Sequence, residues 1–273
     1  MSRRPRGAGN TRGGRGGGRG GGGIVVPPTL EAPLAIPNMK CWFDGRDAIN
    51  TTSSGITSIV GSMGIVSLGQ VTPGFRPTYV TSVPELGGRA ALLFDGVDDG
   101  LLGTVPGDWN FMHNGTGASY FLLERLDSTG PGAQYPLQTN AVDPGQTGAA
   151  CTFTATSVAF RVANGSGTYQ NTLSISGANT GHFARDVARW RGWSYGAGVQ
   201  TSIVSGSFLS APDTVGQTPS GGAPQFALRL GKAASSVMKG YIPQLIIYDR
   251  VLTPAEWASL GAWAASQYPG VAA

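Results

Sequence analysis

The sequence predicts an all-β sandwich that ends in one short helix. Three observations lead to this fold class: short apolar runs alternate with clusters of Gly, Pro, Asn, Asp and Ser from residue 38 onward, 44 of the 273 residues are glycine, and only 12% are charged. The alternation is typical of many short strands joined by tight turns, as in a sandwich or jelly roll. The low charge excludes a coiled coil or a charge-rich disordered chain.

The apolar runs predict eleven strands. Between them no segment keeps a helical period for more than one turn, and no internal repeat of fixed period is present. Two cysteines, Cys41 and Cys151, lie in such runs and are predicted to be buried thiols. The predicted strands cover residues 39–44, 63–68, 90–94, 118–126, 151–155, 157–162, 171–175, 190–195, 199–204, 226–230 and 241–248.

One helix is predicted near the C-terminal end, beginning at Pro254 and ending near Gln267. Thr253 is a good N-cap, Pro254 occupies the first helical position, and Glu256 follows the cap by three residues, which is a capping box. Apolar residues then recur at helical spacing from Trp257. This face is predicted to lie on the sandwich, with its tryptophans in the core.

The N-terminal region has a different composition from the rest. Residues 1–23 hold 11 of the glycines and no acidic residue, so we predict a disordered basic arm. Residues 24–37 contain four prolines and predict an extended linker. Residues 38–273 form the predicted folded domain, whose net charge with the linker is −2. The arginines of the arm are Arg3, Arg4, Arg6, Arg12, Arg15 and Arg19.

This arm is a polycation with no competing structure, so it is predicted to contact a nucleic acid or another acidic surface in a salt-sensitive way. Two alternatives stay open for the region: an assembly contact made by the linker, and a passive flexible tail. The arm begins with basic residues but no apolar stretch follows, so no secretion signal is indicated. No run of 18 apolar residues exists that would cross a membrane.

Two segments resemble a known family. Residues 87–101 (GGRAALLFDGVDDGL) and 240–256 (GYIPQLIIYDRVLTPAE) are similar to the internal strand-and-turn and to the closing strand and helix of LamG-like, concanavalin A-like jelly-roll domains. The order of the flanking motifs also fits, with Trp42-Phe43-Asp44 near the start. The resemblance covers about residues 38–270 and implies the jelly-roll fold, which hosts lectins, adhesion modules, glycosidases and virion proteins.

An acidic turn within the first of these segments is a candidate cation site. Asp95 begins a turn, and Asp98 and Asp99 follow where the chain returns. The resemblance implies calcium, which domains of this fold class sometimes carry, and no other cofactor is indicated. The alternative is that the carboxylates accept backbone N–H groups of the turn, because calcium normally needs six to eight oxygen ligands.

A glycan contact is predicted in the segment 189–195 (RWRGWSY), where aromatic residues alternate with arginine. In a strand, Arg189, Arg191 and Trp193 share one face. Aromatic rings stack on sugars and guanidinium groups reach hydroxyls or anions. The alternative is that Trp190 and Tyr195 are core and the arginines are solvated.

Catalytic motifs are absent from the sequence. The four glutamates do not fall in pairs within one strand, as a glycosidase of this fold would need. There is no nucleophile elbow, and the two histidines and two cysteines are too scattered for a zinc site. The sequence therefore predicts a protein that is not an enzyme.

The leading functional hypothesis is a non-catalytic virion structural protein of capsid, decoration or fibre type. It would be made in the host cytoplasm, would assemble with itself or with other virion proteins, and would use the arm for assembly or nucleic-acid contact. The alternative is a carbohydrate-binding or adhesion module of a bacterial protein. A hydrolase of this fold and a nucleic-acid chaperone acting through the arm are the further candidates.

Overall fold

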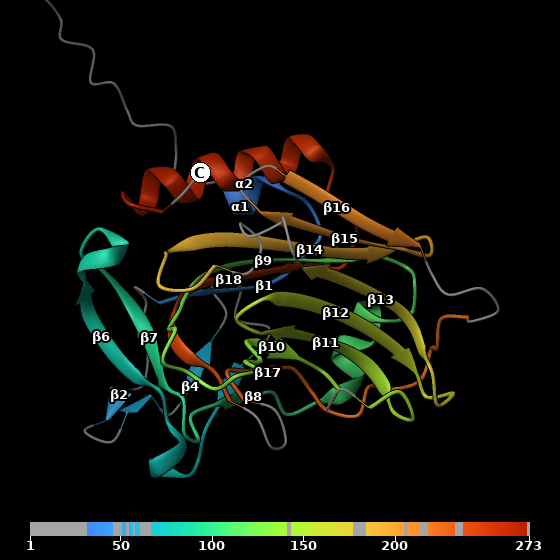
Figure 1. The fold of residues 1–273 in the computed structure, drawn as a ribbon, viewed down its shortest axis with the longest axis horizontal. Coiled ribbons are helices and arrows are strands. Elements are labelled where there is room, and N and C mark those ends of the chain that lie inside the picture. Colours follow the sequence, from blue (N-terminus) through green and yellow to red (C-terminus); the bar gives the residue numbers. More distant parts are fainter. Residues whose placement is uncertain are drawn as a thin grey trace, which may run out of the picture. The chain divides into compact units, whose positions relative to one another are not determined.

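Two antiparallel sheets and one helix form three layers (Figure 1), with α2 (Pro254–Gln267) on one face of the first sheet and the second sheet against its other face. The computed structural model describes residues 32–45, 51–52, 55–56, 58–60, 67–140, 143–176, 184–204, 207–212, 218–232 and 237–271. The predicted arm and most of the predicted linker lie outside these residues. Every strand pair within them is antiparallel.

Sheet I has the strand order β16-β15-β14-β9-β18-β7-β6, and β1 pairs with β18 beside this path. Strands β9 and β18 lie at its centre. Its members are β1 (Met39–Asp44), β6 (Thr78–Val83), β7 (Arg89–Asp95), β9 (Ala118–Leu126), β14 (Arg189–Gly196), β15 (Val199–Val204), β16 (Ser207–Pro212) and β18 (Lys239–Tyr248).

Sheet II has the strand order β13-β12-β11-β10-β17-β8-β5-β4. A separate pair joins β2 (Thr51–Thr52) to β3 (Gly55–Ile56). The members of sheet II are β4 (Ser58–Val60), β5 (Ser67–Gly69), β8 (Leu101–Leu102), β10 (Leu137–Gln138), β11 (Thr147–Phe153), β12 (Ser157–Asn164), β13 (Tyr169–Ser176) and β17 (Arg229–Leu230).

Both faces of sheet I are buried at its centre, which explains why β9 is an almost continuous apolar run. Tyr120 and Leu122 point into the main core between the sheets, whereas Phe121 and Leu123 point into a second core under α2. A strand covered on both faces does not need polar residues at alternate positions. In sheet II, β13 alternates buried and exposed residues from Asn171 to Ser176, so one face of this strand is turned to solvent.

Helix α2 begins as predicted. The N–H of Glu256 donates to the Thr253 hydroxyl, and the N–H of Thr253 donates to the Glu256 carboxylate at 2.8 Å, so the capping box is complete. The helix approaches sheet I closely because glycine stands at the contact: a Cβ on Gly192 would lie 2.5 Å from the ring of Trp257. Trp257 and Trp263 are buried, as predicted.

The segment before β1 packs on sheet I. It contains the short helix α1 (Ala32–Ala35), and the hydroxyl of Tyr248 donates to the carbonyl of Pro33 at 3.0 Å. Ile36 is buried in the core under α2, and Arg250 Nε donates to the carbonyl of Pro37 at 3.1 Å. The last residues of the predicted linker are therefore held by the folded unit.

The prediction of an all-β jelly-roll sandwich with one C-terminal helix is confirmed. The strands predicted at 39–44, 118–126 and 199–204 have the observed bounds, whereas most of the strand predicted at 63–68 lies outside the described residues. Strands β6 and β16 were not predicted. They lie at the two edges of sheet I and carry few long apolar residues, so they give no apolar run.

Both cysteines are buried free thiols, and burial raises the pKa of each well above its usual range. Among the described residues no helix is long and apolar enough to cross a membrane. The described part of the chain also contains the 3₁₀ helices η1 (Pro73–Phe75), η2 (Pro84–Leu86) and η3 (Pro106–Met112).

Candidate functional site

The three residues predicted to contact a glycan lie inside the protein. Arg189, Arg191 and Trp193 share the face of β14 that points toward sheet II, as the alternation predicted, but they are only 8%, 2% and 2% exposed. A buried side chain offers no surface to a sugar ring. The predicted glycan contact at these residues is therefore corrected: in this conformation they are part of the interior.

Arg191 is held by a partner that the sequence did not reveal. Its guanidinium forms an ion pair with Glu124 of β9, donates to the carbonyl of Ala184 at 3.1 Å and lies 4.5 Å from the ring centroid of Phe153. Glu124 is fully buried. The register of β9 and β14 brings the acid and the base together, and the sequence alone does not give this register.

Trp193 belongs to a buried polar network between the sheets. Its indole N–H donates to Gln200 Oε1 at 2.7 Å, and Gln200 Nε2 donates in turn to Asn171 Oδ1 at 2.5 Å. The ring of Trp193 stacks on Tyr120 with centroids 5.5 Å apart. These contacts give the residue a structural role in joining β14 to β13.

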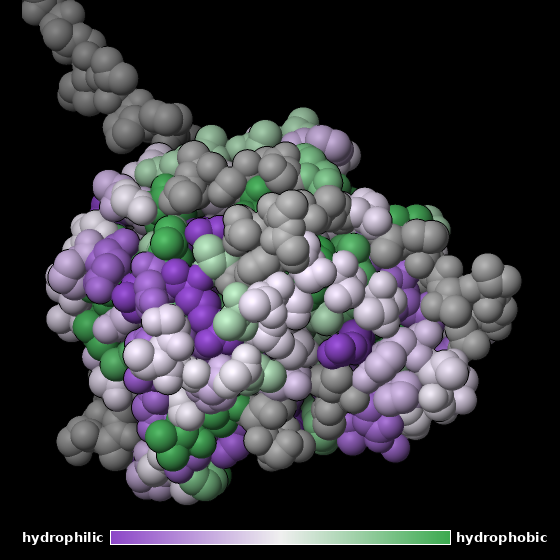
Figure 2. All heavy atoms as spheres, viewed as in Figure 1, coloured by the Kyte–Doolittle hydropathy of each residue, from purple (hydrophilic) through white to green (hydrophobic). Residues whose placement is uncertain are grey.

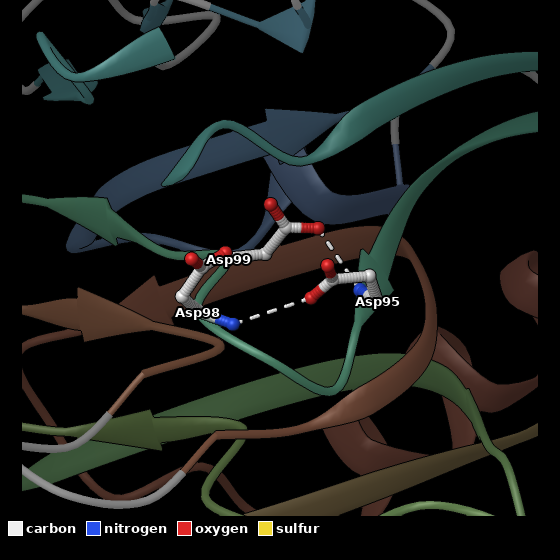
Figure 3. A group of neighbouring side chains, drawn as sticks. All are labelled: Asp95, Asp98 and Asp99. Atoms are coloured by element: carbon white, nitrogen blue, oxygen red, sulfur yellow. Dashed lines mark hydrogen bonds between the residues drawn. The ribbon is translucent and has the colours of Figure 1, made fainter. Parts of the chain in front are cut away.

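The acidic turn brings together the three residues predicted to bind calcium (Figure 3). The carboxylates of Asp95, Asp98 and Asp99 offer oxygen atoms that all lie within 4.8 Å of one another. Two of these carboxylates also accept backbone hydrogen bonds. Asp95 Oδ1 accepts from the N–H groups of Val97 and Asp98 at 2.8 and 3.3 Å, and Asp99 Oδ2 accepts from the N–H of Asp95 at 2.9 Å.

The electrostatics of the turn single out Asp99. Burial, together with the nearby carboxylates of Asp95 and Asp98, raises its pKa to about 6, although the N–H of Asp95 and the Lys232 ammonium act in the opposite direction. These hydrogen bonds match the alternative role, in which the carboxylates shape the turn. Calcium normally needs six to eight oxygen ligands, more than the three carboxylates supply as single ligands. The calcium site stays a prediction.

The outer face of sheet II, turned away from sheet I, was not singled out by the sequence. The strand registers set its side chains in three rows, because the alternate residues point into the main core. The first row is Gly148, Ala163 and Tyr169; the second is Arg229, Gln138, Ala150, Arg161 and Thr172; the third is Thr152, Ala159 and Ser174.

Four small residues lie at the centre of this outer face, and the larger polar and aromatic side chains of the three rows surround them. We call these four residues the floor. The floor is Gly148, Ala150, Ala159 and Ala163, all of them buried. Helix α2 packs on sheet I instead, so it does not cover this surface. Because these four residues are buried, the larger side chains around them form the exposed part of this face.

Arg161 and Tyr169 form the central pair of the outer face. The guanidinium carbon lies 5.5 Å from the centroid of the tyrosine ring, and Arg161 Nη1 donates to the Thr152 hydroxyl at 3.3 Å. Burial raises the pKa of Tyr169, Arg161 opposes this shift, and the nearby carboxylate of Asp143 reinforces it. The phenol is therefore protonated at neutral pH and can donate a hydrogen bond.

Arg229 and Phe226 form a second pair at the other end of the same face. The guanidinium carbon lies 3.4 Å from the ring centroid, and burial lowers the pKa of Arg229. The sequence did contain a signal for both pairs: Arg161 and Arg229 interrupt strands that are otherwise apolar, each with an aromatic residue nearby in the chain. The sequence did not reveal the strand register, which places both pairs on one face of sheet II.

Charged residues also gather where β9, β14 and β18 begin or end, but there acids and bases pair. Arg125 Nη2 lies 3.6 Å from Asp186 Oδ1 and 3.8 Å from Glu85 Oε1, and Lys239 Nζ lies 4.0 Å from Asp127 Oδ2. Figure 2 shows strongly hydrophilic surface at the left of the view, in the region of β7 and the adjoining end of β14. This cluster is largely neutralised by its own members.

The six arginines of the predicted arm, Arg3, Arg4, Arg6, Arg12, Arg15 and Arg19, lie outside the described residues. Their predicted contact with a nucleic acid or another acidic surface stays a prediction.

No protein-family model and no curated protein sequence matches the chain. Solved structures do. The binding domain of botulinum neurotoxin serotype D has a TM-score of 0.56 and 7% identity over 86% of this chain and 53% of its own. Trypanosoma rangeli sialidase in complex with the inhibitor DANA has a TM-score of 0.53 and 12% identity over 81% of this chain and 32% of its own.

A third structure is from botulinum neurotoxin type C, whose cell entry depends on interaction with two ganglioside molecules. It has a TM-score of 0.52 and 9% identity over 83% of this chain and 51% of its own. These likenesses show the fold alone. The chain spans about a third to a half of the length of the structures it matches.

One expectation is corrected by these matches. The sequence predicted a protein that is not an enzyme, because it contains no familiar catalytic motif, but sialidases are among the structures that share this fold. The fold therefore occurs within enzymes, and missing motifs were not sufficient ground for that prediction. At 12% and 11% identity the sialidase matches assign no activity to this chain.

Proposed function

We propose that the protein is a carbohydrate-binding module and that its ligand lies on the outer face of sheet II. The observation that carries this proposal is the pair of Arg161 and Tyr169, whose half-buried side chains stack on each other on the face of sheet II opposite the main core. Thr172, an exposed residue opposite Arg161 in the strand register, adds a hydroxyl group.

This combination suits a sugar. A sugar ring has an apolar face of C–H groups and a rim of hydroxyls. An aromatic ring and a planar guanidinium supply flat surfaces for the former, while guanidinium, phenol and threonine hydroxyl supply donors and acceptors for the latter.

The solved structures of similar fold support the same class of function. They include the binding domain of botulinum neurotoxin serotype D and a structure of botulinum neurotoxin type C, whose cell entry depends on interaction with two ganglioside molecules. Membership of the LamG-like family is also part of this proposal; it is supported by the resemblance of residues 87–101 and 240–256 and by the order of the flanking motifs.

The virion hypothesis has less support. No matched structure described above is a virion protein. Self-assembly, assembly with other virion proteins, a virion location and the role of the arm stay predictions. The carbohydrate-binding alternative is the hypothesis that the geometry and the comparisons favour.

A glycan array probed with the full chain tests the proposal, beside the variants Tyr169→Ala and Phe208→Ala. Phe208 is 43% exposed and lies on β16 of sheet I, so its truncation removes an accessible aromatic ring from a different place. We expect the wild type and Phe208→Ala to bind the same glycans and Tyr169→Ala to lose them. If no glycan binds the wild type, or if Tyr169→Ala binds as the wild type does, the proposal is wrong.

A further inference from the structure

The two arginines of the outer face differ from the paired arginines elsewhere in the structure. Arg191 is paired with Glu124, Arg250 with Glu256 and Arg125 with Asp186. Within the described residues, no carboxylate lies within ion-pair distance of Arg161 or Arg229. The outer face therefore presents positive charge that the folded unit does not neutralise by contact.

Arg229 shows this most clearly. Its guanidinium is stacked on Phe226 at 3.4 Å and partly withdrawn from water, and no described residue accepts a hydrogen bond from its side chain. A guanidinium carries five N–H donors in a fixed plane. The stacking fixes this plane while leaving the donors available to a ligand.

Arg161 is held in a similar way. It stacks on Tyr169, and its one hydrogen bond within the described residues goes to the Thr152 hydroxyl. That neutral acceptor leaves the charge uncompensated. Asp143, an exposed residue whose charge acts on Tyr169, is the acid that borders this end of the face.

The strand register sets the distance between the backbones of Arg229 and Arg161. Arg229 of β17, Gln138 of β10, Ala150 of β11 and Arg161 of β12 are successive partners across the sheet. Three strand spacings separate the two arginine backbones by about 14 Å. One row of the outer face thus carries two fixed cations, with Gln138 and Ala150 between them.

We propose that the ligand of the outer face is an anionic oligosaccharide, whose carboxylate or sulfate groups pair with Arg161 and Arg229. This inference rests on the proposed carbohydrate-binding function and adds the charge of the ligand to it. A guanidinium recognises carboxylate and sulfate oxygens through paired N–H donors, which makes these anions suitable partners.

The experiment compares matched charged and neutral sugars. The full chain is titrated with an oligogalacturonate and its fully methyl-esterified form, and with a dextran sulfate and plain dextran. We expect at least one charged sugar to bind roughly tenfold more tightly than its neutral counterpart, and Arg161→Gln and Arg229→Gln each to weaken it roughly tenfold. Arg161→Lys keeps the charge but not the planar guanidinium. Its affinity for the charged sugar should lie between those of the wild type and Arg161→Gln.

Two control variants distinguish Arg161 and Arg229 from other sources of positive charge in the chain. Arg89→Gln removes an exposed arginine from sheet I, where its Nε donates to the carbonyl of Gln267, and should leave binding unchanged. A full chain with all six arm arginines changed to glutamine should keep the difference between wild-type Arg161 and Arg161→Gln. Circular dichroism and melting temperature establish that each variant is folded.

The outcomes are distinct. Equal binding of charged and neutral sugars, with loss of both in Tyr169→Ala, overturns the anionic ligand but keeps the carbohydrate-binding function. Binding of the charged sugar that survives Arg161→Gln and Arg229→Gln together, or that disappears with the arm arginines, also overturns it. A protein that binds single-stranded DNA through Arg161 and Arg229 but no sugar overturns both proposals.

Discussion

Arg191 and Glu124 form an ion pair in the interior between the two sheets, where the arginine side chain is 2% exposed and the glutamate is fully buried. One nitrogen of the guanidinium, Nη1, and one oxygen of the carboxylate, Oε2, have no hydrogen-bond partner within the described residues. The pair joins β14 to β9 at the centre of the fold. Both side chains are therefore part of the interior and not of a ligand-binding surface.

Breaking this pair should destabilise the fold strongly. Glu124→Gln leaves the arginine charge buried without a partner, so we expect the free energy of unfolding to fall by about 3–5 kcal/mol. Urea denaturation followed by tryptophan fluorescence measures it. The matched control is Lys40→Ala, which breaks the exposed contact with Asp249 and should cost less than about 1 kcal/mol. Similar losses in both variants would contradict a buried pair.

Glu256 should make stability depend on pH at acidic values. The Arg250 guanidinium, aided by the N–H and hydroxyl of Thr253, lowers its pKa to about 2. The stabilisation is therefore complete above about pH 4.5 and is lost as pH falls toward 2. We expect Glu256→Gln to lower the free energy of unfolding by about 1–2 kcal/mol at pH 7 and by little at pH 2. A difference that does not change with pH would argue against this.

Asp99 should make the stability of the protein depend on pH in the opposite direction to Glu256. Its pKa of about 6 exceeds that of an unfolded aspartate, so the native state loses stability as pH rises from about 4 to 6 and stays lower above that. Asp99→Asn keeps an oxygen to accept from Asp95 and removes the charge. We expect it to raise the free energy of unfolding by about 2 kcal/mol at pH 7.5 and by little at pH 4.

Asp108→Asn, at an exposed position on η3, is the control for Asp99 and should change stability by less than about 0.5 kcal/mol. The same variants test the calcium prediction. A rise in melting temperature with millimolar calcium in the wild type, absent in Asp99→Asn, supports it. No calcium effect on the wild type rejects it.

The basic arm should bind nucleic acid in a salt-dependent manner if the sequence-based prediction is correct. In the full chain, changing the six arginines of residues 1–23 to glutamine should abolish binding to single-stranded DNA. The wild-type slope of log affinity against log salt concentration should be about −0.7 for each phosphate contacted. Fluorescence anisotropy measures both. Unchanged binding in the variant would show that the arm is not the contact.

Much of the fold was predictable from local sequence. The capping box of Thr253, Pro254 and Glu256 specifies where α2 begins, and the observed helix starts there. Central strands such as β9 were visible because both of their faces are buried and their residues are nearly all apolar. Edge strands such as β6 were not, because a half-exposed strand of threonine, tyrosine, valine and serine resembles a loop in composition.

The candidate site was less predictable, for a physical reason. Alternation correctly placed Arg189, Arg191 and Trp193 on one face of β14, but it did not say that sheet II covers this face. Arg161 and Arg229 are far apart in the chain and become neighbours on one row only through the pairing of β17, β10, β11 and β12. Such long-range register depends on the whole fold.

The most direct test of carbohydrate binding on the outer face is amide hydrogen–deuterium exchange with and without the best oligosaccharide ligand from the array. Binding there should slow exchange in β11, β12 and β13, centred on residues 150–172, with little change in β6, β7 or the turn at 95–99. The effect should disappear in Tyr169→Ala. Protection confined to another surface, or none at saturating ligand, would contradict the account.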